Sequence, residues 1–424
     1  MEKQLERAFI ENKEQYLEHL LELIRIDTQD IGHGIDGGRE GNGQRYMMDL
    51  FQKMGATVRT QNMTEELIQQ GIELYGEGNP GHNYEDRFNV VAEFTGLDQG
   101  QALLFNGHID TMPPGNLDLW EEDPWKGVVK DGRAYGVGAA DMKGGLMAAV
   151  MAVRLIQDAG LSLPVNVKIA SVVDEEGGGN GSITLAVEGI EANGCVVCEP
   201  TERNVKRAHM GFVFFEIKTT GKALHSGSKW LGVNAIEKMI FLMEGLRILE
   251  NQWLMEYKHP ILPPPTLNFG VLEGGTAGST VPDECTLKIC VHYLPNTMSH
   301  EMVVDDIQSM ISLRAKGDLW LSVHPPTVTI YQSGGGFETS EDAPIVKRAL
   351  ESLQKYIPDA EIVGATAGND ARIFGNIAKI PTVIAGPGHL EQCHSPNEYV
   401  DVEEFYAYIK MYADLILNWN RENN

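Results

Sequence analysis

Cationic residues are scarce in the sequence, and they form no basic run. It contains 34 Lys and Arg against 60 Asp and Glu, a formal net charge of −26 at pH 7. A protein that binds nucleic acid or an anionic membrane surface needs a basic face to neutralise phosphate groups. The composition therefore predicts no nucleic-acid partner, and its negative field weakly favours the binding of metal cations.

Cysteine and long apolar runs are also scarce. The chain has five cysteines, which is an odd number, and it is long. Both facts argue against a disulfide framework. Cys195 and Cys198 have the spacing of a redox or zinc pair, but the apolar segment GCVVCEP favours two small buried side chains. No run of about 18 apolar residues predicts a transmembrane helix, and the charged N-terminus lacks the apolar centre of a secretory signal. We expect a cytoplasmic protein without a membrane partner.

The chain has 424 residues, more than one domain core usually contains, and it shows no internal repeat or low-complexity tract. Its first half alternates between strand-like and helical segments. Strands are expected at residues 89–94, 102–110, 164–173 and 194–198, and helices at residues 44–54 and 143–158, after an N-terminal helix. This alternation predicts an α/β layer with a largely parallel sheet.

The pattern changes after about residue 204 to strand, helix, strand, strand, helix, strand, which is the ferredoxin-like βαββαβ order. These segments are residues 212–220, 233–249, 267–272, 286–294, 300–313 and 327–332. The glycine-rich stretch 331–337 is interpreted as a hinge, after which α/β alternation resumes. We expect one domain of residues 1–205 and 337–424 with a second domain, 206–336, inserted into it.

Carboxylates and imidazoles recur where the strand-like segments end. In FNGHIDT, His108 and Asp110 share one face of the strand, so Asp110 can accept the second ring N–H of a metal-binding histidine. The alternative is a core histidine paired with a turn aspartate. Asp141 in GAADMKGG precedes a helix, where it can cap the helix or bridge two metal ions with its two oxygens.

Glu175 and Glu176 follow the apolar segment VNVKIASVVD. Adjacent side chains on an extended chain point apart, so one can bind a metal while the other acts as general base for an activated water. A solvated acidic loop is the alternative. Glu199 ends the strand in GCVVCEP, at the carboxyl end where ligands gather in open α/β sheets. His394 in CHSPNEYV also follows a strand, with His389 as its local rival.

Oxygen and nitrogen ligands without cysteine predict zinc, with cobalt or manganese as alternatives. A calcium site would use oxygen ligands throughout. A metal in such a site acidifies water, polarises a carbonyl group and stabilises an oxyanion. The residues alone therefore indicate metal-assisted hydrolysis of an amide.

The blocks GHIDT, GAADMKGG, DEEGGG, CEPT, LHSG and CHSPNEYV occur together between about Tyr16 and Trp419. Because these blocks occur in this order, the chain resembles the metallopeptidase family of acetylornithine deacetylase, succinyl-diaminopimelate desuccinylase, aminoacylase and glutamate carboxypeptidase. The resemblance implies a mixed-sheet zinc-hydrolase domain with two zinc ions per subunit. It implies that His108 and Glu199 hold one ion, that Glu176 and His394 hold the other, and that Asp141 bridges them.

The resemblance also assigns supporting roles. Glu175 is the general acid and base, Asp110 orients His108, and a cis peptide bond follows Asp141. Residues 206–336 form a lid that makes a homodimer, and His225 of LHSG binds the substrate oxyanion in the partner's site. A turn residue is the alternative for His225.

The chain departs from the family pattern at Val137, at Thr280 and at His292 in CVHYLP. Where His292 stands, the family usually offers an arginine to the substrate carboxylate, and neutral histidine replaces a bidentate guanidinium poorly. Arg372 in AGNDARIF matches another family arginine and can take that role. The expected substrate-binding residues are Asn268, His292, Asn369 and Arg372, with Gly368 beside them.

The predicted function is removal of an acetyl, succinyl or formyl group from an amino acid or a small amine. The partner is therefore a small-molecule amide. If His292 abolishes carboxylate binding, an N-formyl amine such as a formylaminopyrimidine becomes a candidate substrate. A metallo-carboxypeptidase or dipeptidase using the same dinuclear site is the alternative. A silent metal-binding protein would lack a ligand or Glu175, and none is missing.

Overall fold

The computed structural model describes residues 1–420, which form two compact units. Unit 1 contains residues Met1–Arg207, Thr339–Val363 and the chain from Asn369 onward. Unit 2 contains Ala208–Glu338 and Gly364–Gly368. No helix among residues 1–420 combines the length and apolar character needed to cross a membrane. All five cysteines are free thiols.

The main sheet has the strand order β17-β10-β19-β9-β5-β8-β4-β3, and β18 pairs with β10. Its strands are β3 (Thr57–Asn62), β4 (Phe88–Phe94), β5 (Asp98–His108), β8 (Val165–Val172), β9 (Gly194–Val197), β10 (Val205–His209), β17 (Phe337–Glu338), β18 (Ile362–Ala365) and β19 (Thr382–Ile384). The central strands β19, β9, β5 and β8 are parallel. Strands β4, β3 and β10 pair antiparallel with their neighbours.

The sheet is therefore mixed, and the expectation of a largely parallel sheet is right only for its centre. The reason lies in the connection between β4 and β5. Only three residues separate Phe94 from Asp98, and a link this short reverses the chain, whereas parallel strands need a crossover of about a dozen residues. The apolar character of the strands predicted their existence but not their direction.

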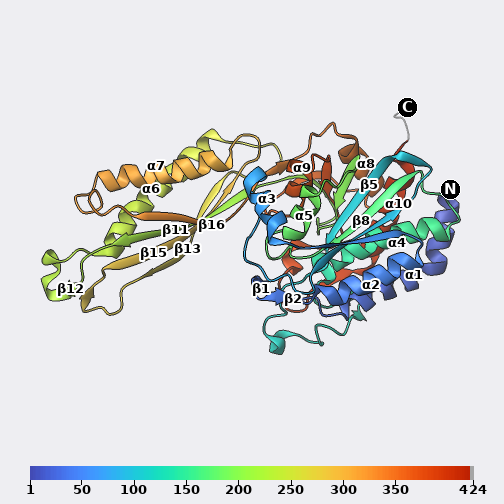
Figure 1. Cartoon of the computed structure of the whole chain (residues 1–424), viewed down its shortest axis with the longest axis horizontal. Coiled ribbons are helices and arrows are strands. Elements are labelled where there is room, and N and C mark those ends of the chain that lie inside the picture. The colour runs from blue at the N-terminus through green and yellow to red at the C-terminus, as the bar shows by residue number, and fades with distance from the viewer. Residues whose placement is uncertain (421–424) are drawn as a thin grey trace. The chain divides into compact units, whose positions relative to one another are not determined.

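Helices cover this sheet (Figure 1). They are α1 (Glu2–Ile24), α2 (Glu40–Lys53), α3 (Glu65–Tyr75), α4 (Gly144–Asp158), α5 (Asn180–Val187), α8 (Pro344–Gln354), α9 (Ala371–Asn376) and α10 (Val402–Asn418). Helix α4 contacts β5, β8, α1 and α10, and almost all of its side chains are buried. At its start, a Cβ on Gly145 would lie 1.8 Å from the Cys198 carbonyl oxygen, so only glycine lets the helix begin this close to β9.

Three smaller sets of strands lie outside this sheet and outside the four-stranded sheet of unit 2. Their members are β1 (Asp30–Gly34) with β2 (Gly37–Gly38), β6 (Val128–Lys130) with β7 (Arg133–Tyr135) and β20 (Tyr399–Asp401), and β12 (Leu224–His225) with β14 (Thr280–Val281). The pairing of β20 with β7 matters for the site, because it joins the chain near residue 399 to the segment that leads into Asp141.

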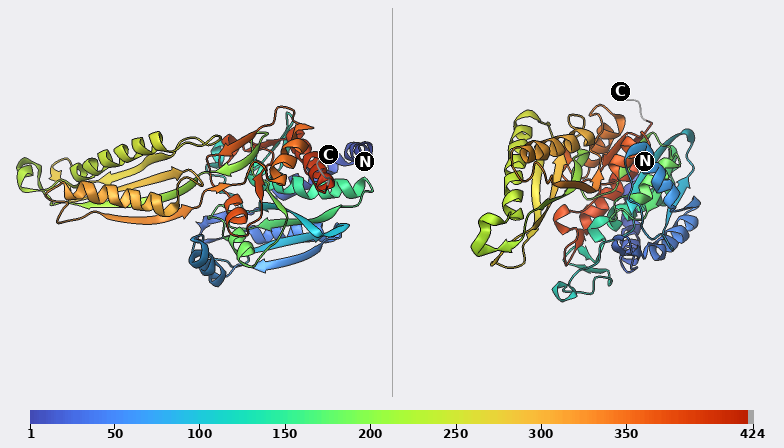
Figure 2. Two further views of the ribbon diagram at one scale, coloured as in Figure 1. Left: turned by 90° about the horizontal axis from the view of Figure 1, so that it is seen from above. Right: turned by 60° about the vertical axis from the view of Figure 1, so that its left-hand side comes forward.

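Unit 2 is a four-stranded antiparallel sheet with two helices packed side by side on one face (Figure 2). The strands of this sheet and the two helices are, in chain order, β11 (Gly211–Thr220), α6 (Ala235–Glu256), β13 (Thr266–Gly274), β15 (Glu284–Tyr293), α7 (His300–Lys316) and β16 (Thr327–Gly334). The strand order is β13-β15-β11-β16. Alternating residues of β11 are buried, as expected for a strand with one face on a core. Strand β16 continues to Gly334, so the glycine-rich stretch is partly strand.

Candidate metal centre

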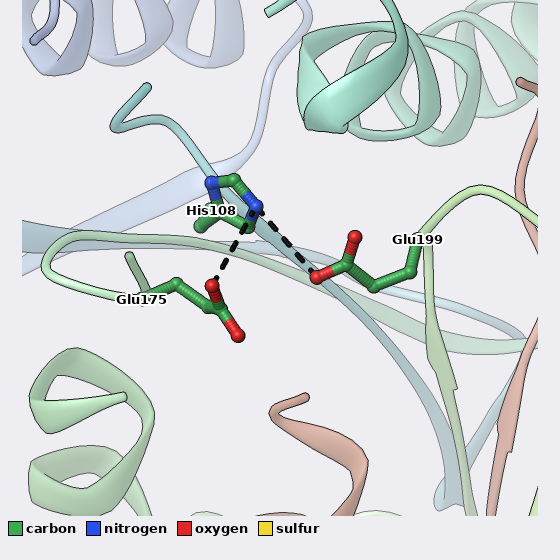
Figure 3. A group of neighbouring side chains, drawn as sticks. All are labelled: His108, Glu175 and Glu199. Atoms are coloured by element: carbon green, nitrogen blue, oxygen red, sulfur yellow. Dashed lines mark ion pairs between the residues drawn. The ribbon is translucent and has the colours of Figure 1, made fainter. Parts of the chain in front are cut away.

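The carboxyl ends of neighbouring parallel strands bring the first group of site residues together. His108 ends β5, Glu175 follows β8 and Glu199 follows β9. Their side chains point toward one another (Figure 3). The imidazole Nε2 of His108 lies 3.6 Å from Oε1 of Glu199 and 4.0 Å from Oε2 of Glu175. This is the convergence at strand ends that open α/β sheets provide.

Asp141 connects this group to a second one. Its Oδ1 lies 3.1 Å from Nε2 of His108, and its Oδ2 lies 3.3 Å from Nε2 of His394. The same His394 nitrogen is 3.0 Å from the carboxylate of Glu176. The five predicted ligands are thus contiguous, in the order Glu199, His108, Asp141, His394, Glu176. One oxygen of Asp141 faces each histidine.

The protonation behaviour of the acids reflects their crowding. Burial, aided by the neighbouring carboxylates, raises the pKa of Glu175 and Glu199 well above the usual range. Four acidic side chains this close, each mostly removed from water, are costly unless a cation compensates them.

The pKa values of the two histidines are also raised, which for an imidazole favours the charged form. Burial lowers the pKa of His108, but the hydrogen bond to Asp141 and the nearby carboxylates outweigh it and raise the pKa well above 6.5. Hydrogen bonds to Asp141 and Glu176 raise the pKa of His394 to about 11. The cluster thus attracts positive charge, and its imidazole and carboxylate donors suit zinc. A divalent cation fits these residues.

A second acidic cluster in unit 1 already has its cation. Asp30, Glu40 and Asp110 lie close enough to hold a metal, but the guanidinium of Arg87 already forms ion pairs with Asp30 and Glu40. Arg87 is buried and donates hydrogen bonds to Glu40 at 2.8 Å and to Asp174 at 2.7 Å. Because Asp174 directly precedes Glu175, this network ties residues near the N-terminus to the turn that carries Glu175.

Asp110 makes a different contact from the expected one. The carbonyl oxygen of Asp110 lies 2.9 Å from Nδ1 of His108, whereas its carboxylate oxygen Oδ1 lies 3.7 Å away. The other carboxylate oxygen accepts the backbone N–H of Glu176 at 2.9 Å. Asp110 therefore contacts both His108 and the Glu175–Glu176 turn, and its orienting role stays a prediction.

The turn that carries Asp141 is held by an acid that the sequence reasoning did not single out. The buried carboxylate of Glu398 accepts the backbone N–H groups of Gly138 and Ala140 at 2.9 Å and of Asp141 at 3.0 Å. The Asp141–Met142 peptide bond is cis, as the resemblance implied. Glu398 lies within the block CHSPNEYV, so its position beside His394 was the available signal.

Arg372 lies in unit 1, buried and already paired. Its Nε donates to Oε2 of Glu77 at 3.1 Å, its Nη1 to the Asn369 carbonyl at 2.8 Å and its Nη2 to the Gly178 carbonyl at 3.0 Å. The side chain of Asn369 accepts the N–H of Ala371. Both residues thus have structural partners within unit 1.

The other four residues proposed for substrate contact, Asn268, His225, His292 and Gly368, lie in unit 2. Asn268 is exposed on β13, and His225 is exposed at the end of β12, where its Nδ1 accepts the N–H of Gly227. His292 is half-buried on β15, with Nε2 3.4 Å from Sγ of Cys290, and burial lowers its pKa. Burial thus favours the neutral imidazole of His292.

A pocket opens above Asp141, Glu176 and His394. The remaining residues that line it are Thr111, Met112, Pro113, Pro114, Trp120, Val137, Ser395 and Glu398. Several of these residues are apolar, and the indole N–H of Trp120 donates to the Pro114 carbonyl at 2.8 Å, which fixes the ring beside that proline. The lining of the pocket is therefore partly acidic and partly apolar.

The mixed α/β fold and the acid and histidine cluster define a hydrolase of the metallopeptidase class. The sequence profile of "Peptidase family M20/M25/M40" matches residues 104–418. The chain belongs to this family.

Named relatives include both deacylases and peptidases. An N-formyl-4-amino-5-aminomethyl-2-methylpyrimidine deformylase from Bacillus subtilis is 31% identical, over 78% of this chain and 83% of that protein. An acetylornithine deacetylase from Proteus mirabilis is 30% identical, over 88% and 96%. The structure of an M20 family metallo-carboxypeptidase from Sulfolobus solfataricus superposes with a TM-score of 0.73 at 18% identity, over 95% of this chain and 98% of that one. At this identity the structural likeness concerns the fold alone.

Proposed function

We propose that the protein is a metal-dependent amidohydrolase that removes a small N-acyl group from an amine or an amino acid. The observation that carries the proposal is the position of Asp141, with one oxygen toward His108 and the other toward His394. A carboxylate placed in this way suits a bridge between two cations. Glu175 lies next to this arrangement, where a general base is needed.

The proposed cofactor is a pair of zinc ions, with cobalt or manganese as substitutes in the same ligands. His108 and Glu199 would hold one ion, Glu176 and His394 the other, and Asp141 both. When bound, the ions acidify a water molecule and polarise the amide carbonyl. Glu175, which also lies near His108 and Glu199, is assigned to proton transfer because the family resemblance gives that role to the first glutamate of the pair.

Glu175 moves the proton in the proposed reaction. It takes a proton from the attacking water, whose oxygen forms a bond to the amide carbon. The C–N bond then breaks, and Glu175 gives the proton to the departing nitrogen. The second proton of the water passes from the new carboxyl group to the released amine, so the products are a carboxylate and an ammonium ion and the atoms of amide and water are all accounted for. Burial raises the pKa of Glu175 above its usual range, which favours its part as proton donor to the departing nitrogen.

The relatives support an N-acyl substrate, because the deformylase and the deacetylase both act on N-acyl groups by name. The second candidate is a metallo-carboxypeptidase or dipeptidase, which the name of the Sulfolobus protein favours. That activity needs a cation for the C-terminal carboxylate of the peptide. In this chain Arg372 is engaged by Glu77, which favours the deacylase.

We further propose that unit 2 is a ferredoxin-like lid that forms a homodimer in the cytoplasm. Its element order and strand order support the fold assignment. In this proposal His225 contributes to the oxyanion site of the partner subunit. Its exposure at the end of β12 leaves the imidazole available for such a contact.

Substitution of Glu175 tests the proposed function. We expect Glu175→Gln to keep its zinc content, measured by atomic absorption, and to lose about 10²- to 10⁴-fold in kcat on N-acyl substrates, because proton transfer is lost while the ligands remain. Glu66→Gln, which removes an exposed acid of α3, is the matched control and should retain full activity. Near-normal turnover in Glu175→Gln would contradict the assigned base.

A further inference from the structure

The turn that carries Glu175 is closed by its own backbone. The N–H of Gly178 donates to the Glu175 carbonyl at 2.7 Å, and the N–H of Gly179 donates to the Asp174 carbonyl at 2.9 Å. The carboxylate of Glu175 lies 4.0 Å from the His108 imidazole, which is too long for a hydrogen bond. The direction of this carboxylate therefore depends on the turn, and Asp174 is the residue from which the turn starts.

Asp174 has a backbone conformation that its surroundings must hold. Its φ of 63° lies in the left-handed region, which residues other than glycine seldom adopt. The side chain is buried, with Oδ1 accepting a hydrogen bond from Nη2 of Arg87 at 2.7 Å and Oδ2 lying 2.9 Å from Nδ1 of His82. A Cβ on Gly34 would lie 2.2 Å from Oδ1, so the end of β1 packs directly on this carboxylate. Three separate segments of unit 1 thus fix Asp174.

Arg87 connects Asp174 to these segments. Its Nη1 donates to the carbonyl oxygens of Gly34 at 3.3 Å and Asn83 at 3.2 Å, and its Nε donates to Glu40 at 2.8 Å. The guanidinium is planar, and each of its three nitrogens has a partner, so its orientation is determined by these contacts. A lysine carries the same charge but lacks the planar fork, so it cannot make the same set of contacts at once.

We propose that Arg87 is a positioning residue for the general base, because through Asp174 it fixes the turn that directs the carboxylate of Glu175. This inference rests on the proposed amidohydrolase function and adds a residue to it. The carboxylate points toward His108 and Glu199 (Figure 3), and a turn that moved freely would not keep it there. The alternative is that Arg87 serves only the stability of unit 1, and the two roles differ in what happens at the turn when its pair with Asp174 is broken.

Hydrogen–deuterium exchange of the metal-free protein tests the positioning role independently of activity. We expect Arg87→Lys to speed exchange of the amides of Gly178 and Gly179 at least about tenfold, because the turn opens more often once Asp174 is released. The control is Glu40→Gln, which changes another buried partner of Arg87 and leaves Asp174 in place, so these amides should exchange within about twofold of the wild-type rate. Exchange in Arg87→Lys that is faster throughout unit 1, with no excess at the turn, would overturn the proposal.

Kinetics of the zinc-loaded protein test whether Arg87 acts through Asp174. The probe is N-acetylalanine, N-formylalanine or N-formylbenzylamine, whichever the wild-type protein hydrolyses. At full zinc occupancy, checked by atomic absorption, Arg87→Lys and Asp174→Asn should each lower kcat about 10- to 100-fold and change KM less than about threefold, because proton transfer depends on the direction of Glu175. The double variant should lose no more than the worse single variant, since both changes break one contact. Losses that multiply would overturn the route through Asp174.

The outcomes separate this inference from the proposed function. If wild-type protein loaded with zinc, cobalt or manganese hydrolyses none of the three probes, the amidohydrolase proposal fails, and the exchange measurement still decides whether Arg87 holds the turn. If a probe is hydrolysed and Arg87→Lys keeps the wild-type kcat, only the inference about Arg87 fails. Should Arg87→Lys not fold, Asp174→Asn, whose side chain has nearly the same shape, breaks the same pair and provides both measurements.

Discussion

At the scale of single residues, His108 and His394 show how protons and metal ions compete for the same site. Without metal, both imidazoles lie among carboxylates that raise their pKa, that of His394 to about 11. Both shifts favour the protonated form of the imidazole. A metal ion binds only the neutral imidazole, so its binding must displace these protons.

Zinc binding should consequently release protons and weaken as the pH falls. We expect calorimetric titration of the metal-free protein at pH 7, repeated in buffers with different ionisation enthalpies, to show release of at least one proton per protein. The affinity should rise steadily from pH 6 to pH 8. Binding that is independent of pH, without proton release, would show that the histidines are not ligands.

The same shift has a consequence for the stability of the metal-free protein. A histidine whose pKa is raised by folding stabilises the folded state fully below its unfolded pKa of about 6.5, and this contribution is lost as the pH rises toward the folded pKa. For His394 the loss extends from about pH 6.5 to about pH 11. Zinc-loaded protein should not show this contribution, because metal then replaces the proton.

At the scale of elements, the turn between β7 and α4 depends on one buried side chain. Three backbone N–H groups of this turn converge on the carboxylate of Glu398, one residue before β20. Because β20 pairs with β7, the acid and the turn are brought to the same place by a short antiparallel contact. The orientation of Asp141 toward both histidines follows from this arrangement.

Glu398→Ala should therefore weaken metal binding without abolishing the fold. Residues that support metal ligands typically contribute about 10- to 100-fold in affinity, and we expect a loss in this range, measured by competition with a chromophoric chelator. Glu391→Gln, an exposed acid seven residues earlier, is the control. Unchanged affinity in folded Glu398→Ala would mean that the turn keeps its conformation without the carboxylate.

At the scale of the whole molecule, the proposed dimer would divide one active site between two chains. Glu175 belongs to unit 1 and His225 to unit 2. In a mixed dimer of Glu175→Gln and His225→Ala subunits, one of the two sites would combine native Glu175 from one chain with native His225 from the other.

Co-refolding or co-expression of these two inactive variants should thus restore activity that neither has alone. The expected maximum is half of the wild-type activity per mixed dimer, because only one of its two sites is intact. Each variant treated alone is the control, and analytical ultracentrifugation establishes the oligomeric state. No recovery in a confirmed mixed dimer would contradict a contribution of His225 to the partner's site.

The sequence by itself determined the kinds of donor atom and their places at strand ends. His108, Glu175 and Glu199 each follow an apolar run, and parallel strands bring such positions to one edge for reasons of geometry alone. The motifs were also local, so each block could be found without knowing the fold. For the same reason the strand directions at β3 and β4, which depend on pairing, could not be predicted.

Only the tertiary structure decided which charged side chains pair with one another inside the protein. Glu77 and Arg372 are 295 residues apart, and nothing local in either segment indicates that one neutralises the other. The same holds for Arg87 and Asp174, which are 87 residues apart. Whether a charged group serves a ligand depends on its burial and its partners, and packing sets both. The sequence thus determined the donors of the metal site, whereas the fold determined that Arg372 is buried against Glu77.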